Sequence, residues 1–132
     1  MNNEKLIELR RSLHSSPELS GEEFATRKRI ISEVEKFSPD ETLMLGKTGI
    51  AFIFKGEAEG PRVMFRADMD ALPIIEENML PYKSEYPGKA HLCGHDGHMT
   101  MLVGLAEMIA SSRPVKGEAV LLFQPAEETG QG

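Results

Sequence analysis

The sequence predicts an α/β fold in which a partial, mixed sheet is flanked by helices. Three segments carry apolar residues at helical spacing, and three others are short continuous apolar runs of the kind found in buried strands. Towards the end of the chain a strand, a helix and a strand follow each other, which indicates a right-handed crossover between parallel strands. The expected order is therefore helix, helix, strand, strand, loop, helix, strand, within one domain of 132 residues.

Two helices are expected first. The spacing of three leucines predicts a helix over 3–14, which Pro17 ends. A second helix is expected over 20–37, where Ser20 followed by Glu23 forms a capping-box pattern. The residues expected on the buried faces are Leu6, Leu9 and Leu13 of the first helix and Phe24, Ile30, Ile31, Val34 and Phe37 of the second.

The rest of the chain is expected to contain strands, one long loop and one helix. Apolar runs over 49–55 and 62–66 predict two strands joined by a turn. Residues 71–90 contain three prolines and few periodic apolar positions, so they predict a long loop. A third helix is expected over 97–112 and a strand over 118–124, and we expect that last strand to be an exposed edge of the sheet.

Composition and charge exclude several classes of protein. Lys and Arg number 15 against 21 Asp and Glu, a formal charge of −6 without a basic stripe, which argues against nucleic acid as a partner. No apolar run approaches the roughly 18–20 residues of a membrane span. One cysteine excludes an intrachain disulfide framework, and the first residues lack the apolar stretch of a secretory signal, so we expect a cytoplasmic protein.

Polar residues that could carry chemistry gather where three of the predicted elements meet loops. If strands 62–66 and 118–124 run parallel, the residues after them share one edge of the sheet with the start of the third helix, where α/β proteins bind ligands. This convergence is a stronger signal than any single residue. The three clusters are Asp68 with Asp70; His91, Cys93, His95, Asp96 and His98; and Glu127 with Glu128.

The middle cluster has the composition of a divalent metal site. In an extended segment His91, Cys93 and His95 would project to one side, and a thiolate with imidazoles suits zinc or a similar ion. Gly94 allows a tight turn between two ligands, and the dipole of the third helix would favour the Cys93 thiolate. A lone cysteine is more often a buried core residue. Here three of the 4 histidines lie within eight residues around the only cysteine, which favours the metal site.

The remaining polar residues each have two interpretations. Pro125 indicates that strand pairing has ended, so Glu127 and Glu128 could both turn to one site, as metal ligand and general base; the alternative is a solvated pair. The aspartates after strand 62–66 are either turn residues or ligands. Asp96 either caps the third helix, which we favour, or orients a ligand histidine, and His98 could simply pack in the first turn.

Four motifs in a fixed order are distributed over nearly the whole chain. They are Leu9 to His14 with Pro17 to Ser20, Arg66 to Ile74, Cys93 to His98, and Gln124 to Glu128. Together they resemble the amidohydrolase branch of the aminoacylase/carboxypeptidase G metallopeptidase family, which includes hippurate hydrolase, N-acyl-amino-acid amidohydrolases, N-acetyl-diaminopimelate deacetylase and indole-acetyl-amino-acid hydrolases. The motifs are specific for the family and not for a substrate.

The resemblance implies a two-metal hydrolase with a mixed α/β catalytic domain and an inserted satellite domain. It implies that Cys93, His95 and Glu128 bind Mn²⁺ or Zn²⁺. Glu127 would be the general base for a metal-activated water that hydrolyses the amide of an N-acyl amino acid, and Asp70 falls where relatives keep an aspartate near the metals. The residues expected to support the ligands are Asp96, His98 and Asp68, which stands where other branches carry a ligand histidine.

Family members are several times longer than this chain, and two further ligand histidines and the satellite domain have no counterpart here. We therefore interpret residues 1–132 as the N-terminal portion of an incomplete catalytic domain. We expect it to be inactive alone and prone to aggregation, whereas longer relatives are expected to dimerise. Two alternatives are an inactive truncated remnant and a small structural metal-binding module. The module would use His91, Cys93, His95 and His98.

Overall fold

The structure is a computed structural model that describes residues 2–132. Every helix and strand expected from the sequence is present, and the described chain contains one additional strand, β1. None of the helices in the described part of the chain has the length and apolar character needed to cross a lipid bilayer. The elements are α1 (Asn3–Ser15), α2 (Phe24–Val34), the 3₁₀-helix η1 (Glu35–Phe37), β1 (Glu41–Leu45), β2 (Gly49–Lys55), β3 (Ala58–Asp68), α3 (His95–Ser111) and β4 (Lys116–Gln124).

The four strands form a mixed sheet in the order β1-β2-β4-β3. β1 pairs with β2 and β2 with β4 in antiparallel fashion, whereas β3 and β4 pair in parallel. The α/β fold with a mixed sheet is therefore confirmed. The expectation that the last strand is an edge is wrong, because β4 lies between β2 and β3. In this interior position Ala119, Val120, Leu121 and Phe123 of its apolar run are buried.

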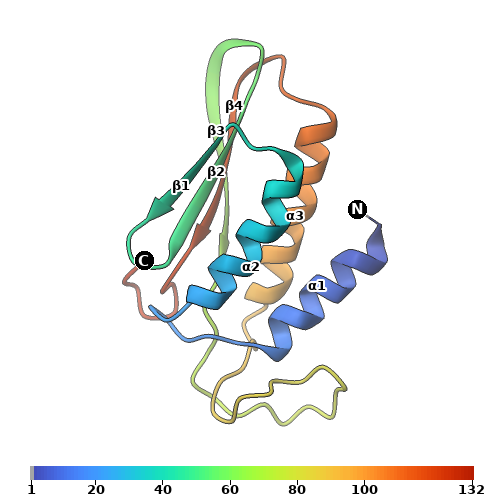
Figure 1. Ribbon diagram of the computed structural model, residues 1–132. Helices are drawn as coiled ribbons and strands as arrows, with labels where there is room; N and C mark the ends of the chain where they lie inside the picture. Colours follow the sequence, from blue (N-terminus) through green and yellow to red (C-terminus); the bar gives the residue numbers. More distant parts are fainter. Residues whose placement is uncertain (1) are drawn as a thin grey trace.

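All three α-helices lie on one face of the sheet, with α2 and α3 next to the strands (Figure 1). The main core fills the space between the helices and that face. On the other face a small cluster of Ala51, Ile53 and Val120 is also buried. The largest side chains of the main core that are fully buried are Phe52, Phe54, Phe123, Ile30, Ile50, Met69, Met99 and Leu121.

The start of α2 differs from the prediction. α2 begins at Phe24, and the Ser20–Glu23 capping box is absent. Ser20 Oγ instead donates to Oδ2 of Asp70 (2.6 Å), and the Glu23 carboxylate accepts from the amide of Gly21 (2.9 Å). Phe24 was expected in the buried stripe but is 47% exposed, because it stands at the open end of the helix. Instead of capping α2, these two polar side chains form hydrogen bonds with residues after β3 and β4.

β3 and the long loop after it lead the chain to the sheet edge where polar residues gather. β3 starts earlier than predicted, at Ala58, with an irregularity in its pairing between Ala58 and Arg62. The predicted loop 71–90 is confirmed and lies below α1 and α3 in Figure 1. Its two ends are joined by a bridge between Leu72 and Ala90. The loop therefore leaves and re-enters the molecule at one place.

Candidate metal centre

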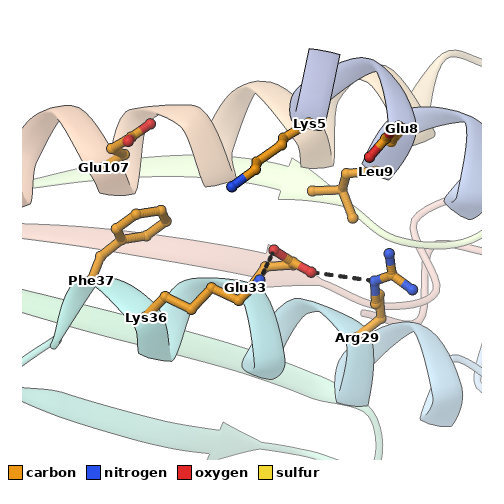
Figure 2. Close-up of a pocket in the computed structure, with 8 residues that line it drawn as sticks. All are labelled: Lys5, Glu8, Leu9, Arg29, Glu33, Lys36, Phe37 and Glu107. Atoms are coloured by element: carbon orange, nitrogen blue, oxygen red, sulfur yellow. Dashed lines mark hydrogen bonds and ion pairs between the residues drawn. The ribbon is translucent and has the colours of Figure 1, made fainter. Parts of the chain in front are cut away.

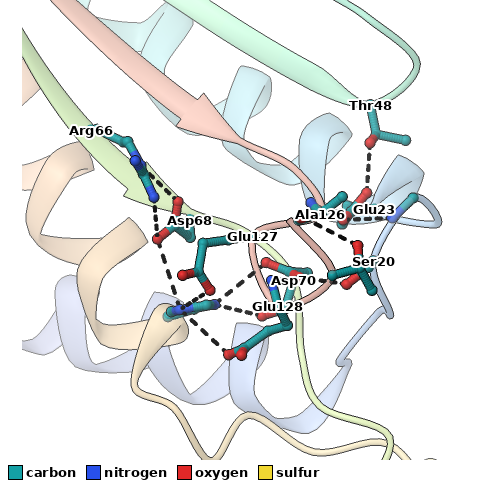
Figure 3. Close-up of polar contacts among 12 residues, drawn as sticks. Ser20, Glu23, Thr48, Arg66, Asp68, Asp70, Ala126, Glu127 and Glu128 are labelled. Atoms are coloured by element: carbon teal, nitrogen blue, oxygen red, sulfur yellow. Dashed lines mark hydrogen bonds and ion pairs between the residues drawn. The ribbon is translucent and has the colours of Figure 1, made fainter. Parts of the chain in front are cut away.

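Polar side chains from three segments meet beyond the ends of β3 and β4 and at the start of α3 (Figure 3). Asp68 pairs with Gln124 in the parallel register, so the segments after both strands leave the sheet at the same edge. α3 begins at His95, directly after Gly94, whose φ of 86° lies in the left-handed region. Gly94 therefore makes the tight turn that was expected of it and delivers His95 to this edge.

His95 is buried and held in one orientation. Its Nδ1 donates a hydrogen bond to the main-chain oxygen of Asp70 at 2.7 Å. Because a carbonyl oxygen can only accept, the proton lies on Nδ1 and Nε2 presents its lone pair. Nε2 is 3.7 Å from a carboxylate oxygen of Glu127, 3.7 Å from one of Glu128 and 3.9 Å from one of Asp68. This is the arrangement in which a histidine binds a metal ion.

Two overlapping sets of ligand atoms surround His95. Cys93, His95 and Glu128 each offer an atom within 4.8 Å of the others, and so do Asp68, His95 and Glu127. The structure thus brings together the three residues that were predicted as metal ligands. Oε1 of Glu128 is buried and has no hydrogen-bond partner among residues 2–132. A buried carboxylate oxygen without a donor, beside a sulfur and an imidazole nitrogen, fits a divalent cation.

Asp70 contacts both His95 and the main chain of Glu128. It is fully buried, and its Oδ2 accepts from Ser20 Oγ (2.6 Å) and from the amide of Glu128 (2.9 Å). Its Oδ1 is 3.5 Å from Nδ1 of His95. Asp70 belongs to neither set of ligand atoms found in the described chain. Its position favours a role in placing His95 and Glu128, while its grouping with the catalytic residues stays a prediction.

Cys93 is exposed and lies among acidic groups. Its thiol bonds to Glu128, and this hydrogen bond, partial burial and the negative charges of Glu128, Glu127 and Asp70 raise its pKa above the usual value. The thiolate expected near the start of α3 is therefore not favoured in these surroundings, because the neighbouring carboxylates oppose a further negative charge. A divalent cation bound beside Cys93 would favour loss of the thiol proton.

The histidines on either side do not join this cluster. Residues 93–94 form a bend and α3 begins at His95, so the segment 91–95 is not the extended one that was expected to place three side chains on one side. His91 is buried, its ring nitrogens have no hydrogen-bond partner in the described chain, and burial lowers its pKa to about 4. His98 is exposed. Of the four residues needed for a closed structural module, the structure therefore brings only Cys93 and His95 together.

Asp96 does not cap α3, contrary to the expectation. The N-cap residue is Gly94, and no side chain makes a capping hydrogen bond at the start of the helix. Asp96 Oδ2 instead lies 2.9 Å from Nε of Arg10 and 2.8 Å from Nδ1 of His14, both on α1. On its other side, Nε2 of His14 is 2.8 Å from Oε2 of Glu76 in the long loop. This buried network joins α1, the loop and the start of α3, next to the residues around His95.

A separate hollow of about 390 Å³ lies among the three helices (Figure 2). Its wall carries charges of both signs. Glu33 pairs with Arg29 at 3.5 Å and with Lys36 at 2.6 Å. These pairs satisfy the charges within α2 and η1, so the hollow offers no set of groups comparable to that around His95. The lining residues are Lys5, Glu8, Leu9, Arg29, Glu33, Lys36, Phe37 and Glu107.

Sequence reasoning missed the roles of several buried polar residues at this edge. The sequence pattern indicates Ser20 and Glu23 only as a helix cap, and it does not indicate His14 and Glu76 as partners of Asp96. These contacts join residues that are up to 103 positions apart, as between Glu23 and Ala126.

Comparison with known proteins finds that the chain is similar to members of one peptidase family. A family model described as peptidase family M20/M25/M40 matches residues 64–132. The chain is 45% identical over 129 residues to N-acetyl-L-cysteine deacetylase of Bacillus subtilis, covering 97% of this chain and 31% of that protein. It is 47% identical over 129 residues to IAA-amino acid hydrolase ILR1-like 6 of Arabidopsis thaliana, covering 96% of this chain and 27% of that protein.

A solved structure shows the same arrangement of elements. The crystal structure of the Bacillus subtilis YXEP protein, described as a dinuclear metal binding peptidase from the M20 family, superposes with a TM-score of 0.92 and 41% sequence identity. The match covers 98% of this chain and 36% of that one. The chain thus spans about a third of the length of the relatives that it matches.

Proposed function

The chain belongs to peptidase family M20/M25/M40, and from this membership we propose that it carries the metal ligands and the general base of an amidohydrolase that cleaves N-acyl amino acids. The observation that carries the proposal is the meeting of Cys93, His95 and Glu128 within 4.8 Å, with Glu127 on the same turn as Glu128. The names of the relatives, a deacetylase and an IAA-amino acid hydrolase, support a small acylated amino acid as substrate.

In the proposed reaction each residue has a defined task. Cys93, His95 and Glu128 would hold Mn²⁺ or Zn²⁺, which would supply the Lewis acidity that lowers the pKa of a water molecule and polarises a carbonyl group. Glu127, with 37% of its side chain exposed, accepts a proton from the attacking water and returns it to the amine nitrogen as the C–N bond breaks. The products are a carboxylic acid and a free amino acid. Because Cys93 can act as the proposed ligand only while its sulfur is not oxidised, we propose that the protein is located in the reducing cytoplasm.

The first test measures metal binding by the chain itself. Titration calorimetry with Mn²⁺ and Zn²⁺ is expected to show binding that weakens at least about tenfold in Cys93→Ser, His95→Ala and Glu128→Gln. His98→Ala is the matched control, because His98 is exposed and belongs to neither set of ligand atoms. Equal affinity in all four variants would contradict the proposed site.

The second test measures hydrolysis. Since the chain spans about a third of the length of its relatives, we expect no detectable turnover by these 132 residues alone. In a chimera, the chain replaces the matching 129 residues of the Bacillus subtilis deacetylase. There Glu127→Gln is expected to lower kcat at least about 10²-fold, because it removes the proposed base. A chimera that keeps full activity after the Glu127→Gln substitution would disprove the role of Glu127.

A further inference from the structure

We infer that Glu23 is a positioning residue for the proposed catalytic pair, because it holds the main chain of Ala126 in the conformation that turns Glu127 and Glu128 towards His95. The inference rests on the proposed function, since it assigns a support to the same site. Glu23 lies at the start of α2, 103 residues away from Ala126 in the sequence. It touches none of the ligand atoms and acts only through the turn.

The carboxylate of Glu23 is buried, and both of its oxygens accept hydrogen bonds. The residue is 0% exposed. Oε1 accepts hydrogen bonds from the amides of Gly21 and Ala126, both at 2.9 Å, and Oε2 accepts from Oγ1 of Thr48 at 2.6 Å. All three partners are donors, as a carboxylate that can only accept requires. Figure 3 shows Glu23 between Thr48 and Ala126.

The turn needs such a support because its backbone is strained. Ala126 has a φ of 51°, a left-handed conformation that is unfavourable for a residue with a Cβ. In a regular strand, neighbouring side chains point to opposite faces, so Glu127 and Glu128 could not both face His95. The left-handed residue breaks that alternation. A hydrogen bond from its amide to a buried carboxylate holds it in place.

The two amides that flank Glu127 are fixed in the same way. The amide of Ala126 donates to Glu23, and the amide of Glu128 donates to Oδ2 of Asp70 at 2.9 Å. Glu127 is thus carried by a main chain that is anchored on both sides to buried carboxylates. Only one of these anchors, Asp70, also contacts His95. Substitution of Glu23 therefore tests the role of the turn without removing a contact to His95, which substitution of Asp70 would do.

The proposal is tested with Glu23→Met, which keeps the length of the side chain and removes both acceptors. Without added metal, we expect the amides of Ala126 and Glu128 to exchange their hydrogens at least about tenfold faster, measured by NMR. Affinity for Mn²⁺, measured by calorimetry, is expected to fall about 10–100-fold, as for other supports of metal ligands. Glu23→Gln is expected to restore both, since its amide oxygen can accept from the two main-chain donors.

Glu18→Met is the matched control. Glu18 also accepts main-chain hydrogen bonds at the start of α2, from Thr26 at 2.5 Å and Ala25 at 3.2 Å, and its side chain has no contact with the turn at Ala126. We expect it to destabilise α2 while leaving exchange at Ala126 and Mn²⁺ affinity unchanged. Equal losses of Ala126 protection and Mn²⁺ affinity in Glu18→Met and Glu23→Met would overturn the inference, because they would show that Glu23 affects only the stability of α2.

A third variant keeps the inference testable if Glu23→Met does not fold. Thr48→Val removes only the donor to Oε2 and is expected to increase exchange at Ala126 and lower Mn²⁺ affinity by a smaller factor. An Ala126 amide that exchanges at the free-chain rate in the unaltered protein would overturn the inference without any variant. If the unaltered protein binds no Mn²⁺, the proposed function fails, whereas protection of the Ala126 amide still decides the role of Glu23.

Discussion

Glu76 is a buried residue of the loop 71–90, and its carboxylate bonds to other residues of that loop and to α1. Only 1% of its side chain is exposed. Burial raises its pKa, but hydrogen bonds from the amide of Ser84, from His14 and from Asn78 together outweigh burial and lower the pKa from 4.5 to about 2. Through His14, the carboxylate also connects the loop to Asp96 at the start of α3. The protonation of one side chain therefore affects three segments.

The lowered pKa of Glu76 predicts a specific loss of stability in acid. A folded-state pKa below the unfolded one stabilises the protein above about pH 4.5, and this contribution disappears as the pH falls from there to about 2. At pH 7 it is about 3 kcal/mol, at 1.36 kcal/mol per pKa unit. We expect Glu76→Gln to lower the melting temperature at pH 7 and to match the unaltered protein near pH 2. The exposed Glu77→Gln serves as control, and a parallel pH curve for both variants would contradict the expectation.

At the level of elements, the sequence predicts best the segments whose structure depends on local apolar spacing. β2 has the predicted bounds, because its continuous apolar run is buried along nearly its whole length. β1 could not be found, since all five of its residues are exposed and show no alternation. The motifs indicated Cys93, His95 and Glu128, and the parallel pairing of β3 with β4 explains why they meet. Glu23 could not be found, because its partners Thr48 and Ala126 lie 25 and 103 residues away.

The β1–β2 hairpin contacts the turn of the candidate site at Gly49. A Cβ at this position would lie 2.8 Å from the main-chain oxygen of Leu45 and 3.0 Å from Cδ of Pro125. We expect Gly49→Ala to lower the free energy of unfolding by about 1–3 kcal/mol, measured by urea denaturation, because a backbone atom must move. Gly97→Ala in α3 has nothing within 4 Å and is expected to raise it by about 0.5–1 kcal/mol. Equal effects would show that space at Gly49 is not limiting.

At the level of the whole molecule, the sheet has helices on one face and two uncovered edges. β3 is one of these edges, and its middle residues are apolar and open to solvent: Val63 is 50%, Met64 58% and Phe65 42% exposed. An exposed, apolar edge strand is a template for pairing with another chain. We therefore expect association through β3 and not through β4, which the sequence predicts as the edge.

We expect the chain to associate in a concentration-dependent manner through β3. Met64→Lys is expected to shift sedimentation velocity profiles towards the monomer, because a charge on an edge strand opposes pairing. Met79→Lys adds the same charge in the long loop, where the side chain is 94% exposed, and is expected to leave association unchanged. A protein that stays monomeric at all concentrations, or equal effects of the two lysines, would contradict this expectation.

The groups around His95 come from three stretches of chain that meet only when β4 lies between β2 and β3. Docking of this last strand closes contacts between residues that are far apart along the polypeptide, which is the slow part of folding for such a topology. An ion can be captured only after that step. A bound cation would therefore slow unfolding and leave the rate of folding nearly unchanged. It would stabilise the native state kinetically without assisting its formation.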